Sequence, residues 1–319
     1  MRFRILSIDG GGIKGVFPAA FLSAIEEKLP HPIARYFDLI TGTSTGGIIA
    51  LGLGFGLTAT QLLDFYVKRG PSIFPKERRR LWRRWTLNWF GSKYQSTALS
   101  SALNDVFGSA QLGQLNSRVL IPTMNASGYI HVYKTPYHHK LETDYKTKIV
   151  DVALATSAAP TYLPPHVSPE GIPFLDGGLW ANNPTGMAVV DAISMLNATR
   201  DNIEVLSLGC TKEPPSFSKI GRGKLAWARA AIEAAMVGQS FASMGTALQL
   251  VGHEHVVRID PDVRPNQFAL DKIEGIEELK GLGYSQARYQ IPHLRPRFFT
   301  EVAAPYEPCH KLETSQRII

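Results

Sequence analysis

The sequence predicts an α/β fold, because strand-like and helix-like segments alternate along its first third. Residues 3–8 alternate and are rich in strand formers; a glycine-rich loop and an apolar helical pattern follow, up to about residue 30. A second short strand, residues 38–41, leads into a Gly-x-Ser-x-Gly turn and then into the apolar run 48–51. Two successive strand–turn–helix units are typical of α/β proteins.

The pentapeptide Gly42-Thr43-Ser44-Thr45-Gly46 predicts a nucleophile elbow. The two glycines leave room where the backbone doubles back, and Ser44 then lies on the turn with its hydroxyl above the edge of the sheet. The same five-residue pattern also occurs by chance in loops rich in serine, threonine and glycine. The strand before it and the helix after it favour the catalytic interpretation.

The loop between the first strand and the first helix, Asp9–Gly15, contains glycine at positions 10, 11, 12 and 15. A dinucleotide-binding fingerprint also requires an acid at the end of the second strand, and this chain has threonine and serine there. A P-loop requires lysine after the last glycine, where this chain has Val16. We therefore expect an oxyanion hole formed by the N–H groups of Gly11 and Gly12, because consecutive glycines are costly in a plain turn.

Asp176 is the candidate partner of Ser44. It follows an apolar pair and precedes Gly177 and Gly178. A carboxylate partly shielded from water can act as a general base for Ser44. The alternative is an Asx turn or helix cap, which is common for Asp-Gly. The later histidines lack a glycine-framed loop, so a Ser44–Asp176 dyad is favoured over a triad; they are His253, His255, His293 and His310.

The remaining periodicities predict further helices and strands. Helices are expected at residues 60–68, 94–107, 149–159, 225–250 and 274–280, and strands at 118–124, 129–134, 203–208 and 256–259. Proline and arginine dominate from Pro292 onward, and we expect a mobile tail over residues 306–319.

Composition limits the class of protein. The 319 residues are 44% hydrophobic, which allows a substantial core. The two cysteines, Cys210 and Cys309, match neither a disulfide framework nor a metal site. The sequence begins without the apolar stretch of a signal peptide and has no apolar run of about 18 residues. We therefore expect a cytoplasmic protein without a bound metal or a membrane-spanning helix.

The positive charge is concentrated in one segment. The formal net charge is +7, and residues 76–93 alone carry +6. Arginine and tryptophan alternate there, and the candidate membrane or ligand contacts are Arg78, Arg79, Arg80, Trp82, Arg83, Arg84, Trp85 and Trp89. Three interpretations stay open: a membrane contact or lid, solvated arginines with tryptophans packed on the domain, and binding of another phosphate-rich partner.

Four blocks, in this order, resemble the patatin-like phospholipase family. They are Asp9–Gly15, Gly42–Gly46, Thr156–Pro160, and Asp176–Gly178 followed by Asn182-Asn183-Pro184. The similarity spans about residues 4–210. It implies a three-layer α/β/α fold with a mainly parallel central sheet, and a serine hydrolase of the phospholipase A type that needs no calcium or other cofactor.

The resemblance also implies roles for particular residues. Ser44 would be the nucleophile, Asp176 its base, and Gly11 and Gly12 the oxyanion donors, with Gly10 and Gly15 in the same loop. Lys14 stands where family members usually have arginine or lysine. Leu163 departs from the pattern, since members often have an aromatic residue before the proline, and it affects the pocket wall at most.

The size and layout further resemble bacterial patatins that act as cyclic-oligonucleotide-activated effectors of antiphage defence. That resemblance implies peripheral contact with the inner membrane, a phospholipid substrate, a possible oligomer and no binding of DNA or RNA duplexes. The arginines of residues 78–84, or Arg258, Arg264 and Lys272, would then be candidates to bind the nucleotide phosphates. The alternatives are a soluble esterase or thioesterase, or a non-catalytic protein that binds membranes or nucleotides.

We expect one patatin-like domain over residues 1–319. Its catalytic core would occupy about residues 4–210 and a helical C-terminal part about residues 211–305, before the tail.

Overall fold

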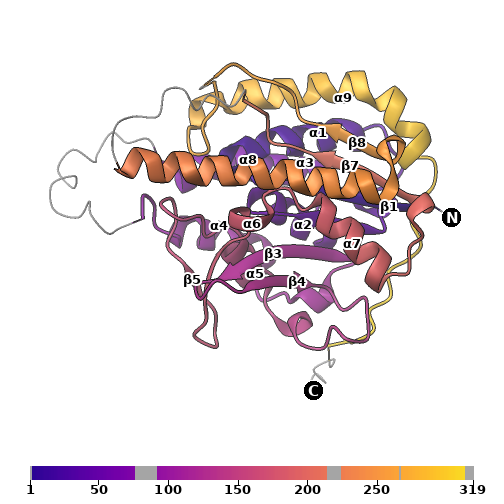
Figure 1. Cartoon of the computed structure of the whole chain (residues 1–319), viewed down its shortest axis with the longest axis horizontal. Coiled ribbons are helices and arrows are strands. Elements are labelled where there is room, and N and C mark those ends of the chain that lie inside the picture. Colours follow the sequence, from indigo (N-terminus) through magenta and orange to yellow (C-terminus); the bar gives the residue numbers. More distant parts are fainter. Residues whose placement is uncertain (1, 76–91, 214–223, 266, 313–319) are drawn as a thin grey trace.

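A central eight-stranded sheet organises the computed structural model, which describes residues 2–75, 92–213, 224–265 and 267–312 (Figure 1). Its strand order is β5-β6-β3-β2-β1-β7-β8, and β4 also pairs with β3. The strands are β1 (Phe3–Ile8), β2 (Leu39–Gly42), β3 (Val119–Asn125), β4 (Ile130–Lys134), β5 (His166–Val167), β6 (Pro173–Asp176), β7 (Ile203–Leu208) and β8 (Val256–Ile259). The pairs β1–β2, β2–β3, β1–β7 and β7–β8 are parallel.

Helices connect and cover these strands. They are α1 (Val16–Glu26), α2 (Thr45–Phe55), α3 (Ala59–Ile73), α4 (Thr97–Phe107), α5 (Ile149–Thr156), α6 (Gly178–Ala181), α7 (Thr185–Met195), α8 (Lys224–Val251) and α9 (Ile276–Phe298). The predicted long helix at 225–250 is therefore confirmed as α8, and the predicted helix at 60–68 extends to residue 73 as α3.

Alternating side chains of the strands divide the core into two layers. Leu6 and Ile40 face the layer that α1 to α5 and α9 pack against, whereas Ile5 and Leu39 face the layer of α7 and α8. Helices thus cover both faces of a mostly parallel sheet, as Figure 1 shows. The predicted three-layer α/β/α fold with a mainly parallel sheet is confirmed.

The register of the parallel strands brings the carboxyl-terminal ends of β1, β2 and β7 to the same edge of the sheet. Ile8 pairs with Gly42 on β2 and with Leu208 on β7, so the segments that follow these three strands begin at the same level. The glycine-rich loop follows Ile8, and the Gly-x-Ser-x-Gly turn includes Gly42. The loop and the turn therefore lie side by side, at the edge where ligands bind in α/β sheets.

Strand β6 approaches the same place from the opposite direction. Thr41 of β2 pairs with Leu120 of β3, and Asp176 of β6 pairs with Thr123 farther along β3. Strand β4 occupies the other edge of β3 along residues 120–124. Strands β2 and β6 consequently share one edge of β3 and lie end to end, so that the last residue of β6 faces the turn after β2.

The C-terminal helix is longer than predicted. Helix α9 continues through Pro292 and Pro296, although a proline inside a helix costs about 3 kcal/mol. Its buried residues, such as Leu294 and Phe298, pack into the core beside α1, and this packing outweighs the lost backbone hydrogen bonds. The predicted helix at 274–280 is therefore present but continues to residue 298, because local proline signals do not report tertiary packing.

The chain after α9 runs back along the domain. The N–H group of Cys309 donates to the carbonyl oxygen of Pro136 at 2.7 Å, and His310 contacts the carbonyl oxygen of His139 at 2.8 Å. The last seven residues of the predicted tail, 313–319, lie outside the described residues. The division into core, helical part and tail stays a prediction.

The close contact between α1 and α9 depends on Gly283, so Gly283→Ala should destabilise the fold. An added Cβ would lie 2.7 Å from both Ala20 Cβ and the carbonyl oxygen of Phe17. We expect a loss of about 1–3 kcal/mol in the free energy of unfolding, measured by urea denaturation.

Gly281→Ala, in the same helix, is the matched control. Among the described residues, no atom outside the adjacent residues and the nearby backbone of the same helix lies within 4 Å of a Cβ at that position, so this variant should gain about 0.5–1 kcal/mol from helix propensity. Equal stabilities of the two variants would contradict the packing argument.

Candidate active site

Ser44 occupies the sharp turn between β2 and α2. Its backbone has φ 54° and ψ −121°, a conformation that residues with a side chain seldom adopt. The turn is closed tightly: a Cβ at Gly42 would lie 2.1 Å from the carbonyl oxygen of Gly46. Only glycine fits there, which explains the first glycine of the motif. The Ser44 side chain lies just beyond the end of β2, where it lines a pocket.

Thr156, at the end of α5, holds this turn. Its hydroxyl accepts the N–H of Ser44 at 3.1 Å and donates to the carbonyl oxygen of Pro122 at 2.8 Å. The side chain is fully buried, so the contact is shielded from water. Thr156 is the first residue of the family block Thr156–Pro160, and this position was the signal in the sequence that could have predicted its role in the site.

Asp176 lies opposite Ser44 at the end of β6. Its carboxylate accepts the N–H of Gly178 at 2.6 Å, and both Asp176 and Ser44 line the same pocket. Burial raises the pKa of Asp176 to about 7, and the influence of Gly178 and of the Ser44 hydroxyl opposes that rise. A buried carboxyl group with a pKa near neutral, close to a serine hydroxyl, has the properties of a general base.

The glycine-rich loop borders the same space. Gly12 has φ +56°, and a Cβ there would lie 2.2 Å from the carbonyl oxygen of Leu270. Within the described residues, the N–H groups of Gly11 and Gly12 have no hydrogen-bond acceptor. Two unpaired backbone donors beside Ser44 can bind a developing oxyanion.

The other loop residues predicted for the site make structural contacts. The N–H of Gly10 donates to the carbonyl oxygen of Asn182 at 3.0 Å. The ammonium of Lys14 donates to the carbonyl oxygen of Thr211 at 3.3 Å. Gly15 packs against Thr45, since a Cβ would lie 2.5 Å from its hydroxyl. These three residues shape the loop, while the free donors belong to Gly11 and Gly12.

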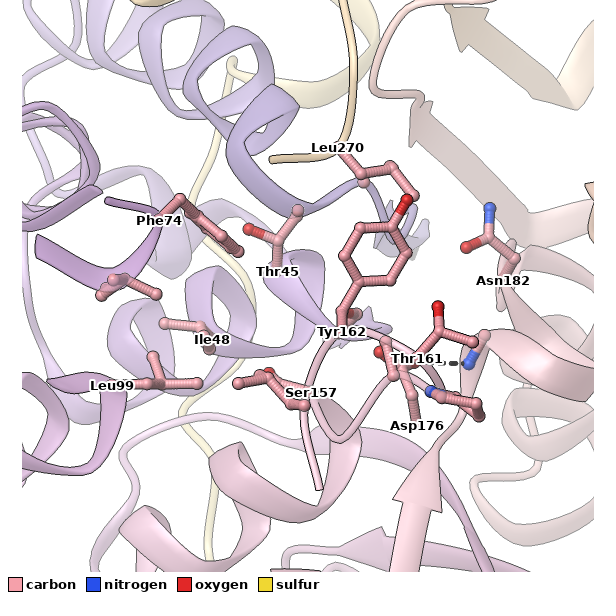
Figure 2. A pocket seen from close by; sticks show the side chains of 18 of the residues that line it. Thr45, Ile48, Phe74, Leu99, Ser157, Thr161, Tyr162, Asp176, Asn182 and Leu270 are labelled. Atoms are coloured by element: carbon pink, nitrogen blue, oxygen red, sulfur yellow. Dashed lines mark hydrogen bonds between the residues drawn. The ribbon is translucent and has the colours of Figure 1, made fainter. Parts of the chain in front are cut away.

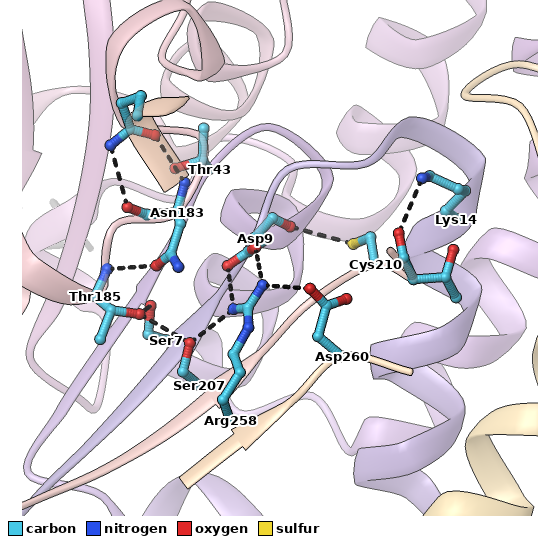
Figure 3. A network of polar contacts seen from close by, with 12 residues as sticks. Ser7, Asp9, Lys14, Thr43, Asn183, Thr185, Ser207, Cys210, Arg258 and Asp260 are labelled. Carbon is cyan, nitrogen blue, oxygen red and sulfur yellow. Dashed lines mark hydrogen bonds and ion pairs between the residues drawn. The ribbon is translucent and has the colours of Figure 1, made fainter. Parts of the chain in front are cut away.

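A polar network anchors the start of the loop (Figure 3). The guanidinium of Arg258 binds both carboxylate oxygens of Asp9, at 2.9 and 2.6 Å. The same group donates to Ser207 and Asp260, each at 2.8 Å. Arg258 therefore has its donors engaged inside the protein, which favours a structural role over the nucleotide contact considered from sequence.

A pocket of about 150 Å³ opens beside Ser44 and Asp176. Figure 2 shows Ile48, Phe74 and Leu99 on one side of it and Asp176 and Asn182 on the other. Further apolar lining comes from Phe65, Tyr66, Ile73, Leu163 and Leu179. No histidine is among the described residues that line the pocket. The arrangement suits a substrate with a long apolar part next to a polar reacting group.

The arginine- and tryptophan-rich stretch predicted to contact a membrane or ligand lies outside the described residues, as all eight candidates fall within 76–91. In the part of the chain that the structure describes, no helix has both the length and the hydropathy to cross a membrane. The described ranges also contain no group of three or more His, Cys, Asp or Glu residues able to hold a metal ion.

Comparison with known proteins adds independent findings. The patatin-like phospholipase family model matches residues 6–189. A cGAMP-activated phospholipase of Pseudomonas aeruginosa is 34% identical over 282 residues, which cover 85% of this chain and 83% of that protein. Proteins of the same name from Vibrio cholerae and Escherichia coli are 37% and 36% identical, over 68% and 71% of this chain and 66% and 67% of their own lengths.

The buried Asp176 should cost stability when it ionises. Its pKa is about 7 in the folded protein against an ordinary value of 3.8, so the folded state binds more protons between these pH values. Stability therefore falls as the pH rises through this window. We expect Asp176→Asn to melt at a higher temperature than wild type at about pH 8, with the advantage shrinking toward pH 4.

The measurement is thermal unfolding followed by circular dichroism across that range. Asp201→Asn, an exposed substitution of the same kind, should show no such trend. A melting-temperature difference for Asp176→Asn that does not change with pH would contradict the burial argument.

Proposed function

The chain belongs to the patatin-like phospholipase family, whose members are lipid hydrolases, and we propose that it cleaves acyl esters of membrane phospholipids with a Ser44–Asp176 dyad. The observation that carries this proposal is one pocket that brings together Ser44 on its sharp turn, the buried Asp176 carboxylate and two glycine amides without an acceptor among the described residues. Nucleophile, base and oxyanion donors are the three parts that acyl transfer requires.

In the acylation step, Ser44 Oγ forms a bond to the ester carbonyl carbon while its proton passes to Asp176. The carbonyl oxygen becomes an oxyanion, which the N–H groups of Gly11 and Gly12 stabilise by about 3 kcal/mol each. The carbon–oxygen bond to the leaving alcohol then breaks, and the alcohol takes the proton from Asp176. The product is an acyl-serine at residue 44.

Deacylation repeats the sequence with water. Asp176 accepts a proton from a water molecule as its oxygen attacks the acyl carbon, and the same amides hold the second oxyanion. The bond to Ser44 Oγ breaks, and the proton on Asp176 returns to that oxygen. The fatty acid leaves and the dyad is restored without any cofactor.

The shape of the pocket supports a lipid acyl chain as substrate. Its apolar side, formed by residues such as Ile48, Phe74 and Leu99, offers a desolvated surface for methylene groups, each worth about 0.8 kcal/mol when buried. The glycerol and headgroup would remain toward the opposite side, near Asn182 (Figure 2). Peripheral binding at the inner membrane would give the enzyme access to such chains.

We further propose that a cyclic oligonucleotide activates the enzyme. Three relatives are named cGAMP-activated phospholipases, and the first alignment covers 282 residues, more than the family model's span of residues 6–189. The similarity to the P. aeruginosa protein therefore includes chain beyond that span. An antiphage role, in which activation leads to damage of the cell's own membrane, belongs to the same proposal.

The first test is fatty-acid release from anionic phospholipid vesicles, measured by mass spectrometry. Wild type and Ser44→Ala would be compared with and without cyclic dinucleotides, cGAMP among them. We expect release only by wild type and only with one nucleotide, because the variant lacks the nucleophile while keeping the fold. The loss should exceed about a thousandfold.

The same experiment separates the alternatives. Release by wild type without any nucleotide would remove the activation proposal and leave a constitutive lipase. Hydrolysis of short soluble esters that vesicles do not increase would indicate a soluble esterase or thioesterase. Release that persists in Ser44→Ala would overturn the dyad.

The pH dependence of turnover tests the base. Asp176 must be ionised to accept the proton of Ser44, and its pKa is about 7. With the activating nucleotide present, we expect kcat/KM for a soluble chromogenic ester to rise with pH, with a midpoint near 7 and a plateau above it. A rate that is flat between about pH 5.5 and 8.5 would contradict this assignment.

A further inference from the structure

The oxyanion loop is supported from outside by a segment far away in sequence. The carbonyl oxygen of Leu270, between β8 and α9, accepts the N–H of Ile13 at 2.8 Å. The same oxygen touches Gly12, where a Cβ would lie 2.2 Å from it. Leu270 also lines the pocket, as Figure 2 shows. One peptide group thus contacts the loop immediately beside the proposed oxyanion donors.

The next residue, Asp271, is held by two side chains. Its carboxylate accepts the ammonium of Lys93 at 2.5 Å and the hydroxyl of Tyr94 at 2.9 Å. The Asp271 side chain is only 10% exposed, so this ion pair lies largely out of water. Charge-assisted hydrogen bonds in such surroundings are short and directional, and they fix the position of the backbone that carries them.

Lys93 and Tyr94 are in turn bound to another segment that lines the pocket, residues 161–162. The N–H of Lys93 donates to the carbonyl oxygen of Thr161 at 2.9 Å, and the N–H of Tyr94 donates to that of Tyr162 at 2.8 Å. The Tyr94 ring also packs edge-on against Phe74, with centroids 5.5 Å apart. Asp271 therefore ties the oxyanion loop to the wall that would border the acyl chain.

We propose that Asp271 is a positioning residue of the active site: through Leu270 it orients the N–H groups of Gly11 and Gly12 toward the reacting carbonyl. The inference rests on the proposed acyl-transfer function. Glycine has the widest backbone freedom of any residue, so the peptide at Gly12 needs an outside contact to hold one orientation. Leu270 provides this contact, and Asp271 determines where Leu270 lies. Stabilisation of an oxyanion requires donors that are already oriented before the reaction.

The chain contains a matched control for this arrangement. Asp191, on α7, also accepts hydrogen bonds from one lysine, Lys134, and one tyrosine, Tyr137. It is likewise buried, but none of these three residues is among those that line the pocket. Asp191→Asn and Asp271→Asn thus remove the same charge from the same kind of cluster. The cluster of Asp271 adjoins the pocket through Leu270, and the cluster of Asp191 does not line it.

The experiment measures kcat and KM of wild type and both variants for 4-nitrophenyl butyrate, in the presence of the nucleotide that activates wild type in the vesicle assay. Deuterium uptake by peptides that cover residues 9–15 is measured on the same proteins. For Asp271→Asn we expect kcat to fall about tenfold or more, KM to change less than about twofold, and uptake in 9–15 to rise. For Asp191→Asn we expect a lower melting temperature with kcat and uptake in 9–15 unchanged.

Equal kcat values for the two variants, or unchanged uptake in 9–15 for Asp271→Asn, would overturn the inference. If Asp271→Asn does not fold, Tyr94→Phe removes one of its two contacts, and a smaller loss of kcat with KM unchanged is then expected; no loss would overturn the inference. Absence of Ser44-dependent hydrolysis by wild type would instead overturn the proposed function, while deuterium uptake still tests the contact between Asp271 and the loop.

Discussion

The site depends on one edge of β3, which two strands of opposite direction share. Strand β2 pairs with the beginning of that edge and β6 with its end, so Ser44 and Asp176 meet across the gap between two strand termini. Each strand is fixed by its hydrogen-bonded register, because a slip of one residue would turn every side chain to the other face. The separation of the proposed nucleophile and base is therefore set by the sheet rather than by a flexible loop.

The same arrangement places destabilising features together. Ser44 has a strained backbone, and Asp176 is buried with its pKa raised to about 7. Both persist because surrounding groups hold them: Thr156 binds the N–H of Ser44, and Gly178 donates to the carboxylate. A strained backbone and a buried ionisable group both reduce the free energy of unfolding, and such features often occur together at functional sites.

The last third of the chain completes the site although the family model matches residues 6–189 alone. Arg258 on β8 binds Asp9 at the start of the glycine-rich loop, and Leu270 supports Gly12 within it. Helix α9 packs along α1, which follows the same loop. The C-terminal elements therefore contact the glycine-rich loop from outside, and a change in them can alter the geometry of the proposed site without contacting Ser44.

The sequence by itself determined the features that depend on neighbouring residues. Periodicity identified most strands and most helices, although not β5 or β6. The turn around Ser44 followed from its two glycines, since sterics at a sharp turn act within a few positions. Only the tertiary structure decided which distant groups meet. Asp9 and Arg258 are 249 positions apart, and α9 continues through two prolines because of its packing. Burial, which sets the ionisation of Asp176, likewise belongs to the assembled fold, because it depends on atoms from many segments at once.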